Sequence, residues 1–281
     1  MIPQQNLSKL SNRLANRGGR RIPEAVLERD YCIAWFLISL SRTPLRSRIA
    51  FKGGTALKHC YIGDYRFSED LDFTLVEKIE FDVIRKELDS VFSEALRSAG
   101  IKFSFVRQDP DSHRNSYTFY IGYEGPLPSV SASKEIKVDI TIREKVIFPL
   151  ENIPVLKAYP EYSDLPDNAN ILIYSLQEIA VEKVVALMDK ARNEPRDLYD
   201  LWYLITEDHI SLENLADAIK TKWDFRGKPF SEAGSNFLSK EARYDKLWSI
   251  RLSAQMTHLP KFDTVYRIVK RAFRQAGLLN K

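Results

Sequence analysis

The 281-residue sequence has little of what would place it in several familiar classes of protein. Two cysteines, Cys32 and Cys60, make neither a disulfide framework nor a cysteine-ligated metal site, and the four histidines are scattered. The amino-terminal segment lacks the apolar core of a signal peptide. The longest apolar run near it, Cys32 to Leu40, is far shorter than the ~20 residues of a membrane helix. We therefore expect a cytoplasmic protein with reduced thiols and no membrane segment.

Several nucleotide-binding and protease motifs are also absent. The sequence has no G-x-x-x-x-G-K-[ST] loop, no G-x-G-x-x-G behind an expected strand and no H-E-x-x-H. It shows no internal repeat, low-complexity stretch or long Gly/Ser linker. Hydrophobic residues make up 44% and charged residues 28%, which excludes wholesale disorder. The length allows one large domain or two modest ones.

The net charge of +4 hides an uneven distribution. Residues 1–50 carry nine Lys/Arg and three Asp/Glu, and residues 220–281 carry fourteen and five, so the segment between them has a net charge of −11. Basic ends around an acidic centre indicate a protein that holds a polyanion at its flanks and gathers carboxylates at its centre. The alternative is that solvated helix faces happen to be basic.

Apolar periodicity predicts strands and helices in alternation, followed by helices alone. Strands are expected at 48–51, 71–76, 101–106, 117–123 and 135–142. Helices are expected at 24–42, 80–99, 175–191, 196–206, 211–221, 241–255 and 262–276. This order is typical of an α/β domain followed by a mainly helical C-terminal domain. Prolines punctuate the segment between them, and we place the two domains at 1–165 and 166–281.

Three acidic residues stand on two of the expected strands. Asp70 and Asp72 are spaced i, i+2, so a strand presents both on one face. Such carboxylates repel each other unless a cation lies between them, and Mg²⁺ takes oxygen ligands of this kind. Asp139 also points away from its strand's apolar face, so neighbouring strands would let all three share one or two metal ions for attack on a phosphorus. Taken singly, the Asp-x-Asp pair is a solvated strand edge and Asp139 a polar surface residue.

Gly53-Gly54-Thr55 follows the first expected strand. Two glycines allow a close approach of the backbone to a phosphate, and Thr55 is placed to cap a following helix whose amides face the anion. Lys58 in the first turn of that helix opposes the helix dipole, which a bound phosphate would explain. Alone, a Gly-Gly pair is simply a turn.

Charged residues also interrupt the expected helices of the second half. Lys183 falls in the apolar stripe of the helix that begins after Ser175, so it must extend to solvent or meet a negative charge, from a nucleotide phosphate or from a buried ion pair. Glu178 is explained as the second member of a capping box with Ser175. Asp197 and Asp200 lie one helical turn apart, and Asp197 also suits a helix start.

In order, these motifs resemble those of the AbiEii/AbiGii toxin family, which are nucleotidyltransferases of the polymerase-β-like superfamily. The resemblance extends over residues 25–205, and its first block is the most specific. The matching motifs are Gly53-Gly54-Thr55, Arg66-x-Ser68-x-Asp70-x-Asp72-Phe73, Lys137-Val138-Asp139-Ile140, Glu182-Lys183 with Ala186-Leu187, and Arg196-Asp197-x-Tyr199-Asp200.

The resemblance implies a fold, a site and an activity. The fold would be an α/β nucleotidyltransferase domain with a mixed sheet, followed by a helical domain. Mg²⁺, or Mn²⁺, would be bound by Asp70, Asp72 and Asp139. The NTP substrate would contact Gly53, Gly54, Thr55, Arg66, Ser68 and Lys183. The residues expected to be catalytic are Asp70, Asp72, Asp139, Lys183 and Asp197.

The expected reaction adds a nucleotide to the 3′ end of tRNA and so blocks translation, and a cognate antitoxin is expected as a partner. The basic flanks suit a tRNA partner. Two other functions stay open. One is nucleotidyl transfer to a protein or small-molecule hydroxyl, and the other is a non-catalytic nucleotide- or RNA-binding module. The presence of three carboxylates together with Lys183 favours catalysis over binding alone.

Overall fold

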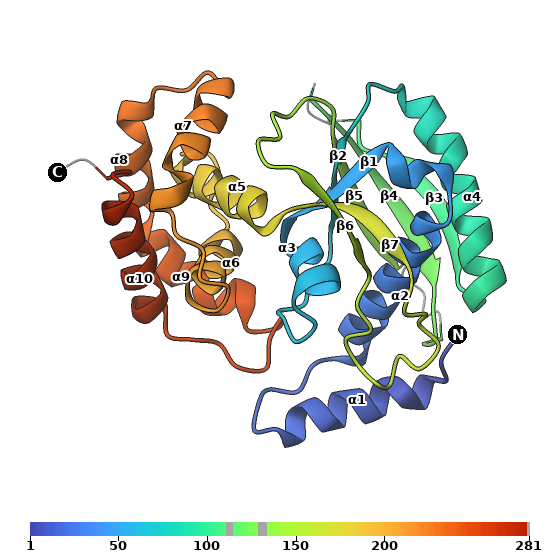
Figure 1. Cartoon of the computed structure of the whole chain (residues 1–281). Helices are drawn as coiled ribbons and strands as arrows, with labels where there is room; N and C mark the ends of the chain where they lie inside the picture. Colours follow the sequence, from blue (N-terminus) through green and yellow to red (C-terminus); the bar gives the residue numbers. More distant parts are fainter. Residues whose placement is uncertain (111–114, 129–133, 280–281) are drawn as a thin grey trace. The chain divides into compact units, whose positions relative to one another are not determined.

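The computed structural model describes residues 1–110, 115–128 and 134–279 and divides into two compact units (Figure 1). Unit 1 comprises Met1–Glu144 and Leu150–Ile173, and unit 2 comprises Lys145–Pro149 and Tyr174–Lys281. The boundary predicted after residue 165 precedes the last strand of unit 1. That strand belongs there because Ile173 pairs with Phe51 in the parallel ladder of the sheet.

Unit 1 is built on a seven-stranded sheet with the order β3-β4-β5-β2-β1-β7-β6. The β2–β5 and β1–β7 pairs are parallel, and the β1–β2, β3–β4 and β4–β5 pairs are antiparallel, so the predicted mixed sheet is confirmed. The two short strands β6 and β7, in the proline-punctuated segment, were not predicted. The strands are β1 (Ile49–Lys52), β2 (Leu71–Leu75), β3 (Lys102–Gln108), β4 (Ser116–Glu124), β5 (Glu135–Thr141), β6 (Leu150–Pro154) and β7 (Asn170–Tyr174).

Helices α2 and α4 of unit 1 pack against each other and against the sheet. Phe103 of β3 contacts Phe36 of α2 and Phe92 of α4, with ring centroids 5.7 and 6.2 Å apart. The second half of α2, from Cys32 on, carries no charged residue, and all of its side chains are buried. The helices of this unit are α1 (Gln4–Asn16), α2 (Glu24–Ser41), η1 (Pro44–Ser47), α3 (Gly53–Ala56), its π-helical continuation η2 (Leu57–Tyr61) and α4 (Phe81–Ala99).

Unit 2 is helical, as predicted. Helix α5 packs on α6, α7 and α8, while α6 packs on α9 and α10. Stacked rings of Phe237 and Phe273, 4.4 Å apart, join α8 to α10. The helices are α5 (Leu176–Met188), α6 (Pro195–Thr206), η3 (Glu213–Leu215), α7 (Ala216–Phe225), η4 (Phe230–Glu232), α8 (Ala233–Leu238), α9 (Glu241–Leu252) and α10 (Phe262–Gln275).

The predicted capping box at the start of α5 is half correct. Ser175 accepts a hydrogen bond from the Glu178 amide, as an N-cap should. The Glu178 carboxylate instead accepts the amides of Ile147 and Phe148, each at 2.9 Å, and pairs with Lys222 at 2.5 Å. The fully buried ammonium of Lys222 requires a counter-charge, and this use of Glu178 also attaches Lys145–Pro149 to unit 2.

Candidate active site

The two carboxylates of the Asp-x-Asp motif lie at the start of β2. Asp70 immediately precedes the strand and Asp72 is its second residue, and both side chains are half-buried. Leu71 and Phe73, which alternate with them, are buried in the core. The predicted alternation along this strand is therefore confirmed.

Asp139 of β5 stands beside Asp72. The parallel ladder between β2 and β5 places these two residues directly opposite each other. The Asp139 carboxylate accepts a hydrogen bond from the Thr118 hydroxyl of β4 and forms an ion pair with Lys137, Oδ2 to Nζ 2.6 Å. The strand pairing thus brings the third acidic position to the first two, as the sequence analysis expected if the strands were neighbours.

Lys137 is a cation in direct contact with this acidic group, through its ion pair with Asp139. Burial lowers the pKa of Lys137, but its hydrogen bond to Asp139 and the negative charges of Asp139, Asp70 and Asp72 outweigh that effect, so the pKa is raised above its ordinary value. The charges of all three carboxylates therefore act on the Lys137 ammonium. The sequence analysis gave Lys137 no role, although its position two residues before Asp139 places it on the same face.

Gly53 begins helix α3 and lies against Asp72. Its φ of +83° is in the left-handed region, and a Cβ added there would lie 2.9 Å from Asp72 Oδ2. Glycine is thus required at this position by both the backbone and the neighbouring carboxylate. Gly54, the next residue, is buried in the first turn of α3.

Thr55 does not cap a helix, which corrects the prediction made for it. Helix α3 begins at Gly53, and the buried Thr55 hydroxyl lies 2.5 Å from the Asp70 carbonyl and 2.8 Å from the Ser68 hydroxyl. These contacts tie the Gly-Gly turn to the residues that lead into β2. Thr55 thereby helps to position Asp70.

Two basic residues of this region have their charged groups in the protein interior. Arg66 is buried, and its guanidinium donates to the Phe67 carbonyl at 3.4 Å. The sequence analysis used a bound phosphate to explain the position of Lys58 in the first turn of a helix. Lys58 is instead fully buried, and its ammonium donates to the Tyr159 hydroxyl at 3.1 Å and lies 3.9 Å from the Asp30 carboxylate. A structural ion pair therefore accounts for Lys58 without a ligand.

The late motif residues lie in unit 2 and form one buried network. The Lys183 ammonium of α5 is 2.7 Å from carboxylate oxygens of both Asp197 and Asp200 of α6. Arg192 pairs with the other oxygen of Asp197 at 2.6 Å. Burial raises the pKa of Asp197, but Lys183 and Arg192 outweigh it and hold the pKa well below its usual range. The buried ion pair, one of the two partners considered for Lys183, is thus present.

Sequence reasoning missed Lys240. This buried residue precedes α9, and its ammonium donates to the carbonyls of Asp189 and Arg192 at 2.8 and 3.0 Å. It thereby holds the loop between α5 and α6 from which Arg192 reaches Asp197. No local pattern marks Lys240. Lys222, also missed, shares the buried face of α7 with Ala218, Ile219 and Trp223, and that position was a usable signal.

The residues predicted to function thus fall into two sets. Unit 1 brings Gly53, Gly54, Thr55, Ser68, Asp70, Asp72 and Asp139 together, and unit 2 pairs Lys183 with Asp197. The carboxylates of β2 and β5 supply the hard oxygen donors that Mg²⁺ takes and are half-buried rather than sealed, so they fit such an ion chemically. Within the described ranges, however, no group of three or more His, Cys, Asp or Glu side chains is arranged to hold a metal ion.

Two expectations about the chain as a whole can be compared with the structure. Cys32 and Cys60 are both free and buried. Residues 1–110, 115–128 and 134–279 include no helix that is both long and apolar enough to cross a membrane.

Comparison with solved structures shows the same fold in bacterial proteins. The structure of JHP933 from Helicobacter pylori superposes with a TM-score of 0.56 at 21% identity, covering 91% of this chain and 93% of that one. A putative nucleotidyltransferase from H. pylori gives a TM-score of 0.55 at 21% identity, with 92% and 100% covered. MenT4, a nucleotidyltransferase toxin from Mycobacterium tuberculosis, gives 0.56 at 16% identity, with 98% and 90% covered. No curated protein sequence matches the chain.

A family model settles the relationship. The model of the nucleotidyl transferase AbiEii toxin of type IV toxin–antitoxin systems matches residues 35–269, which include both sets of site residues. The predicted resemblance, the predicted fold and the predicted class of enzyme are thereby confirmed. The chain belongs to the AbiEii family of nucleotidyltransferase toxins.

Proposed function

We propose that the protein transfers a nucleotide from an NTP to the 3′-hydroxyl at the acceptor end of an RNA, namely tRNA, and that this blocks translation. The observation that carries the proposal is the juxtaposition of Asp72 and Asp139 on adjacent parallel strands, with the Gly53 turn against Asp72. This arrangement offers carboxylates for a metal and, beside them, a glycine backbone that a triphosphate can approach. The basic flanks of the chain supply charge of the sign that RNA needs.

The carboxylates and the Gly-Gly turn of unit 1 then have defined tasks. Asp70, Asp72 and Asp139 would hold Mg²⁺, or Mn²⁺, whose charge offsets that of the triphosphate. Gly53 and Gly54 leave room for the phosphates, and the Thr55 contact keeps Asp70 in place.

The bond changes follow from this placement. The 3′-oxygen of the acceptor forms a bond to the α-phosphorus of the NTP. The bond between the α-phosphorus and the oxygen that bridges it to the β-phosphorus breaks, and pyrophosphate is released. Asp139 lies on the solvent-accessible part of β5, and we assign it the task of accepting the proton of the attacking hydroxyl. Thr118 and Lys137 orient its carboxylate for this step.

The late motif residue Lys183 is proposed to act on the charge of the nucleotide. Lys183 would offset negative charge on the bound NTP, while its ion pairs with Asp197 and Asp200 hold the direction of its ammonium. Direct contacts of Arg66, Ser68 and Thr55 with the nucleotide stay predictions, because the described contacts of these three side chains are internal. A cognate antitoxin is the protein partner that this family implies, and a cytoplasmic location accords with tRNA as acceptor.

The test is an assay of labelled products. The full chain is incubated with total tRNA, Mg²⁺ and each α-labelled NTP in turn, and the RNA is resolved on a sequencing gel. Asp72→Asn, which keeps the side-chain shape, is run in parallel with Asp82→Asn, which changes an exposed residue at the start of α4.

We expect one or more NTPs to label tRNA, the Asp72 variant to lose the label and the Asp82 variant to keep it. Label on tRNA that survives in Asp72→Asn would mean that the carboxylate site is misassigned. No label on RNA with any NTP, from a protein that still binds NTP, would rule out an RNA acceptor and direct the search to protein or small-molecule hydroxyls.

A further inference from the structure

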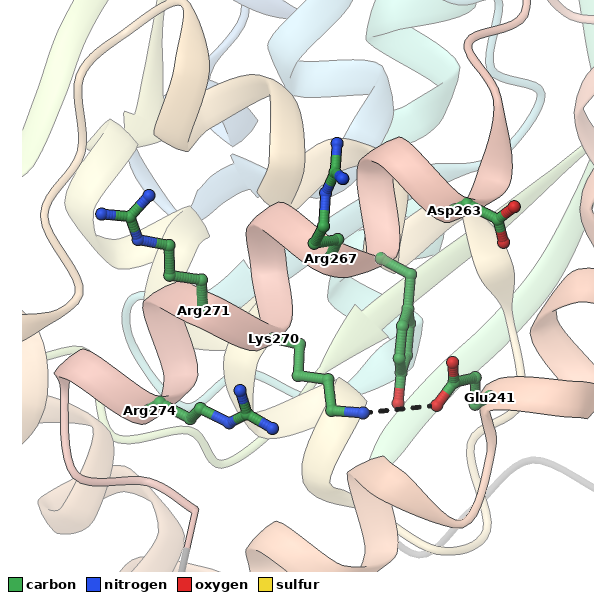
Figure 2. A pocket seen from close by; sticks show the side chains of 7 residues that line it. Glu241, Asp263, Arg267, Lys270, Arg271 and Arg274 are labelled. Atoms are coloured by element: carbon green, nitrogen blue, oxygen red, sulfur yellow. Dashed lines mark ion pairs between the residues drawn. The ribbon is translucent and has the colours of Figure 1, made fainter.

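Helix α10 separates its apolar side chains from its basic ones. The buried face consists of Phe262, Val265, Tyr266, Val269 and Phe273. Four cations project from successive turns on another side, as Figure 2 shows, and we call them the α10 patch: Arg267, Lys270, Arg271 and Arg274. Because they are three and four residues apart, they share one face of the helix.

The α10 patch lines an open pocket of about 460 Å³ in unit 2. Asp263 and Glu241, a residue of α9, line it as well (Figure 2). Lys270 pairs with Glu241 at 3.5 Å, so one of the four cations has an internal partner. The pocket wall is therefore predominantly cationic.

The three arginines of the patch differ in their surroundings from Arg13 and Arg192. Arg13 and Arg192 pair with buried or half-buried carboxylates at 2.6 Å. By contrast, across the residues that the structure describes, no hydrogen bond or ion pair engages Arg267, Arg271 or Arg274, and all three are exposed. Like charges at this spacing on a helix repel each other. Arg274 complements the dipole in the last turn of α10, but that reason does not extend to Arg267 and Arg271, which lie further from the end.

We propose that the α10 patch binds the sugar–phosphate backbone of the acceptor RNA, an inference that rests on the proposed transfer to RNA. A guanidinium donates two parallel hydrogen bonds to a phosphate, so arginine suits this contact better than lysine. Arg271 and Arg274 lie ~6 and ~10 Å along the helix axis from Arg267, so the patch meets several phosphates of one strand. Contacts of this kind set the position of the RNA without selecting a base sequence.

Two other anionic partners suit the patch less well. A helix that binds a membrane surface inserts its apolar face among the lipids, but the apolar face of α10 is buried against α6, α8 and α9. A protein interface needs a buried aromatic or aliphatic anchor at its centre. Among the described residues that line this pocket only Tyr266 is aromatic, and it is itself buried. RNA requires neither feature.

The experiment compares two triple variants of the full chain. Arg267→Gln/Arg271→Gln/Arg274→Gln removes three charges from the patch. The matched control, Lys220→Gln/Lys246→Gln/Arg251→Gln, removes three charges from exposed residues of unit 2 that do not line this pocket. Binding of a fluorescently labelled tRNA-sized transcript is followed by anisotropy at several salt concentrations. Vesicles containing an anionic phospholipid are the second probe.

We expect the patch variant to lose at least about tenfold in RNA affinity and the control to change by about twofold or less. The slope of log affinity against log salt should fall by about 2–3, since each phosphate contact contributes about 0.7–0.9. Replacing the same arginines with lysine should give an affinity between those of the wild type and the glutamine variant, because the charges remain while the paired hydrogen bonds are lost. Equal RNA binding by the patch variant and the control, or a loss of vesicle binding in place of RNA binding, would overturn the proposal. A lysine variant that binds as poorly as the glutamine variant would also contradict it.

The transfer assay separates this proposal from the one on which it rests. If no RNA is ever labelled but RNA binding still depends on the patch, the proposed transfer fails and the binding surface stands. If RNA is labelled and the patch variant has an unchanged KM for RNA, the binding surface fails and the transfer stands. In the expected case the KM for RNA rises while the KM for NTP does not change.

Discussion

Gly53 and Asp72 are in direct apposition, so that a single methyl group on Gly53 would lie 2.9 Å from the Asp72 Oδ2 atom. The φ of Gly53 is +83°, so its backbone and its neighbour both require glycine. The turn that would receive the triphosphate and the carboxylate that would hold the metal are therefore built as one unit. A substitution that enlarges Gly53 should therefore displace the Asp72 carboxylate.

Gly53→Ala should reduce activity much more than stability. The left-handed backbone costs an alanine about 1–2 kcal/mol of unfolding free energy, and the added methyl group displaces Asp72. A displacement of that kind should lower nucleotide transfer ten- to about a hundredfold. Gly100→Ala is the control, because Gly100 has a φ of +69° and nothing within 4 Å of the added Cβ. Equal activity of the two variants, measured alongside their urea unfolding, would refute the role given to this apposition.

Lys183→Met should destabilise the protein strongly. It leaves the carboxylates of Asp197 and Asp200 buried with one cation fewer, which costs about 3–5 kcal/mol in comparable buried pairs. Lys102→Met, which removes an exposed ion pair with Glu124, should cost less than about 1 kcal/mol. Chemical denaturation of both variants measures the difference. A loss at Lys183 as small as that at Lys102 would show that the network contributes nothing to folding.

The stability of unit 2 should depend on pH through Lys240. Burial lowers the pKa of Lys240 to about 8, although the charges of Asp189 and Asp197 partly oppose this. The unfolded chain, where the pKa is near 10.5, therefore binds this proton more tightly than the folded chain. The unfolding free energy should consequently rise as the pH increases from about 8 to about 10.

Lys240→Met removes the group responsible for that rise. The difference in unfolding free energy between wild type and variant, measured at several values of pH from 7 to 10, should increase with pH in favour of the wild type. A difference that is independent of pH would mean that the proton on Lys240 is held equally in both states. Asp189 and Arg192, whose carbonyls accept from Lys240, should show altered amide exchange in the variant.

Lys137→Met should strengthen metal binding. Its ammonium lies 2.6 Å from Asp139 and within the field of Asp70 and Asp72, so it competes with any cation for those oxygens. Without it, Mn²⁺ affinity measured by electron paramagnetic resonance should rise several-fold. Lys102→Met, on the exposed surface of β3, is the matched control. Weaker or unchanged Mn²⁺ binding would indicate that the metal does not use the carboxylate that Lys137 contacts.

Most of the sheet and the helical second half could be predicted from the sequence. Asp70, Asp72 and Asp139 were placed on strands because alternation of apolar and polar residues depends only on near neighbours in the chain. Strands β6 and β7 escaped prediction because they are short and lie among prolines. Helix α1 was not predicted, although Leu7, Leu10 and Leu14 recur at helical spacing. The helix expected after Thr55 begins two residues earlier, at Gly53.

The partners of charged side chains were much harder to predict. The Glu178 carboxylate was expected to cap its own helix, and the structure uses it to satisfy Lys222. Lys58 was explained by a phosphate, and the structure surrounds it with Asp30 and Tyr159. In each case the ammonium is fully buried, so its counter-charge depends on which elements pack against it.

The sequence by itself determined the inventory and its order: a Gly-Gly turn, two carboxylates on one strand face, a third on a later strand and a helix at 262–276 within a basic segment. These follow from side-chain chemistry and from the periods of strands and helices. Only the tertiary structure decided that Asp139 stands opposite Asp72, that Gly53 touches Asp72 and that Lys183 meets Asp197. Strand register and helix packing join residues that are distant along the chain, and no local pattern encodes which of them meet.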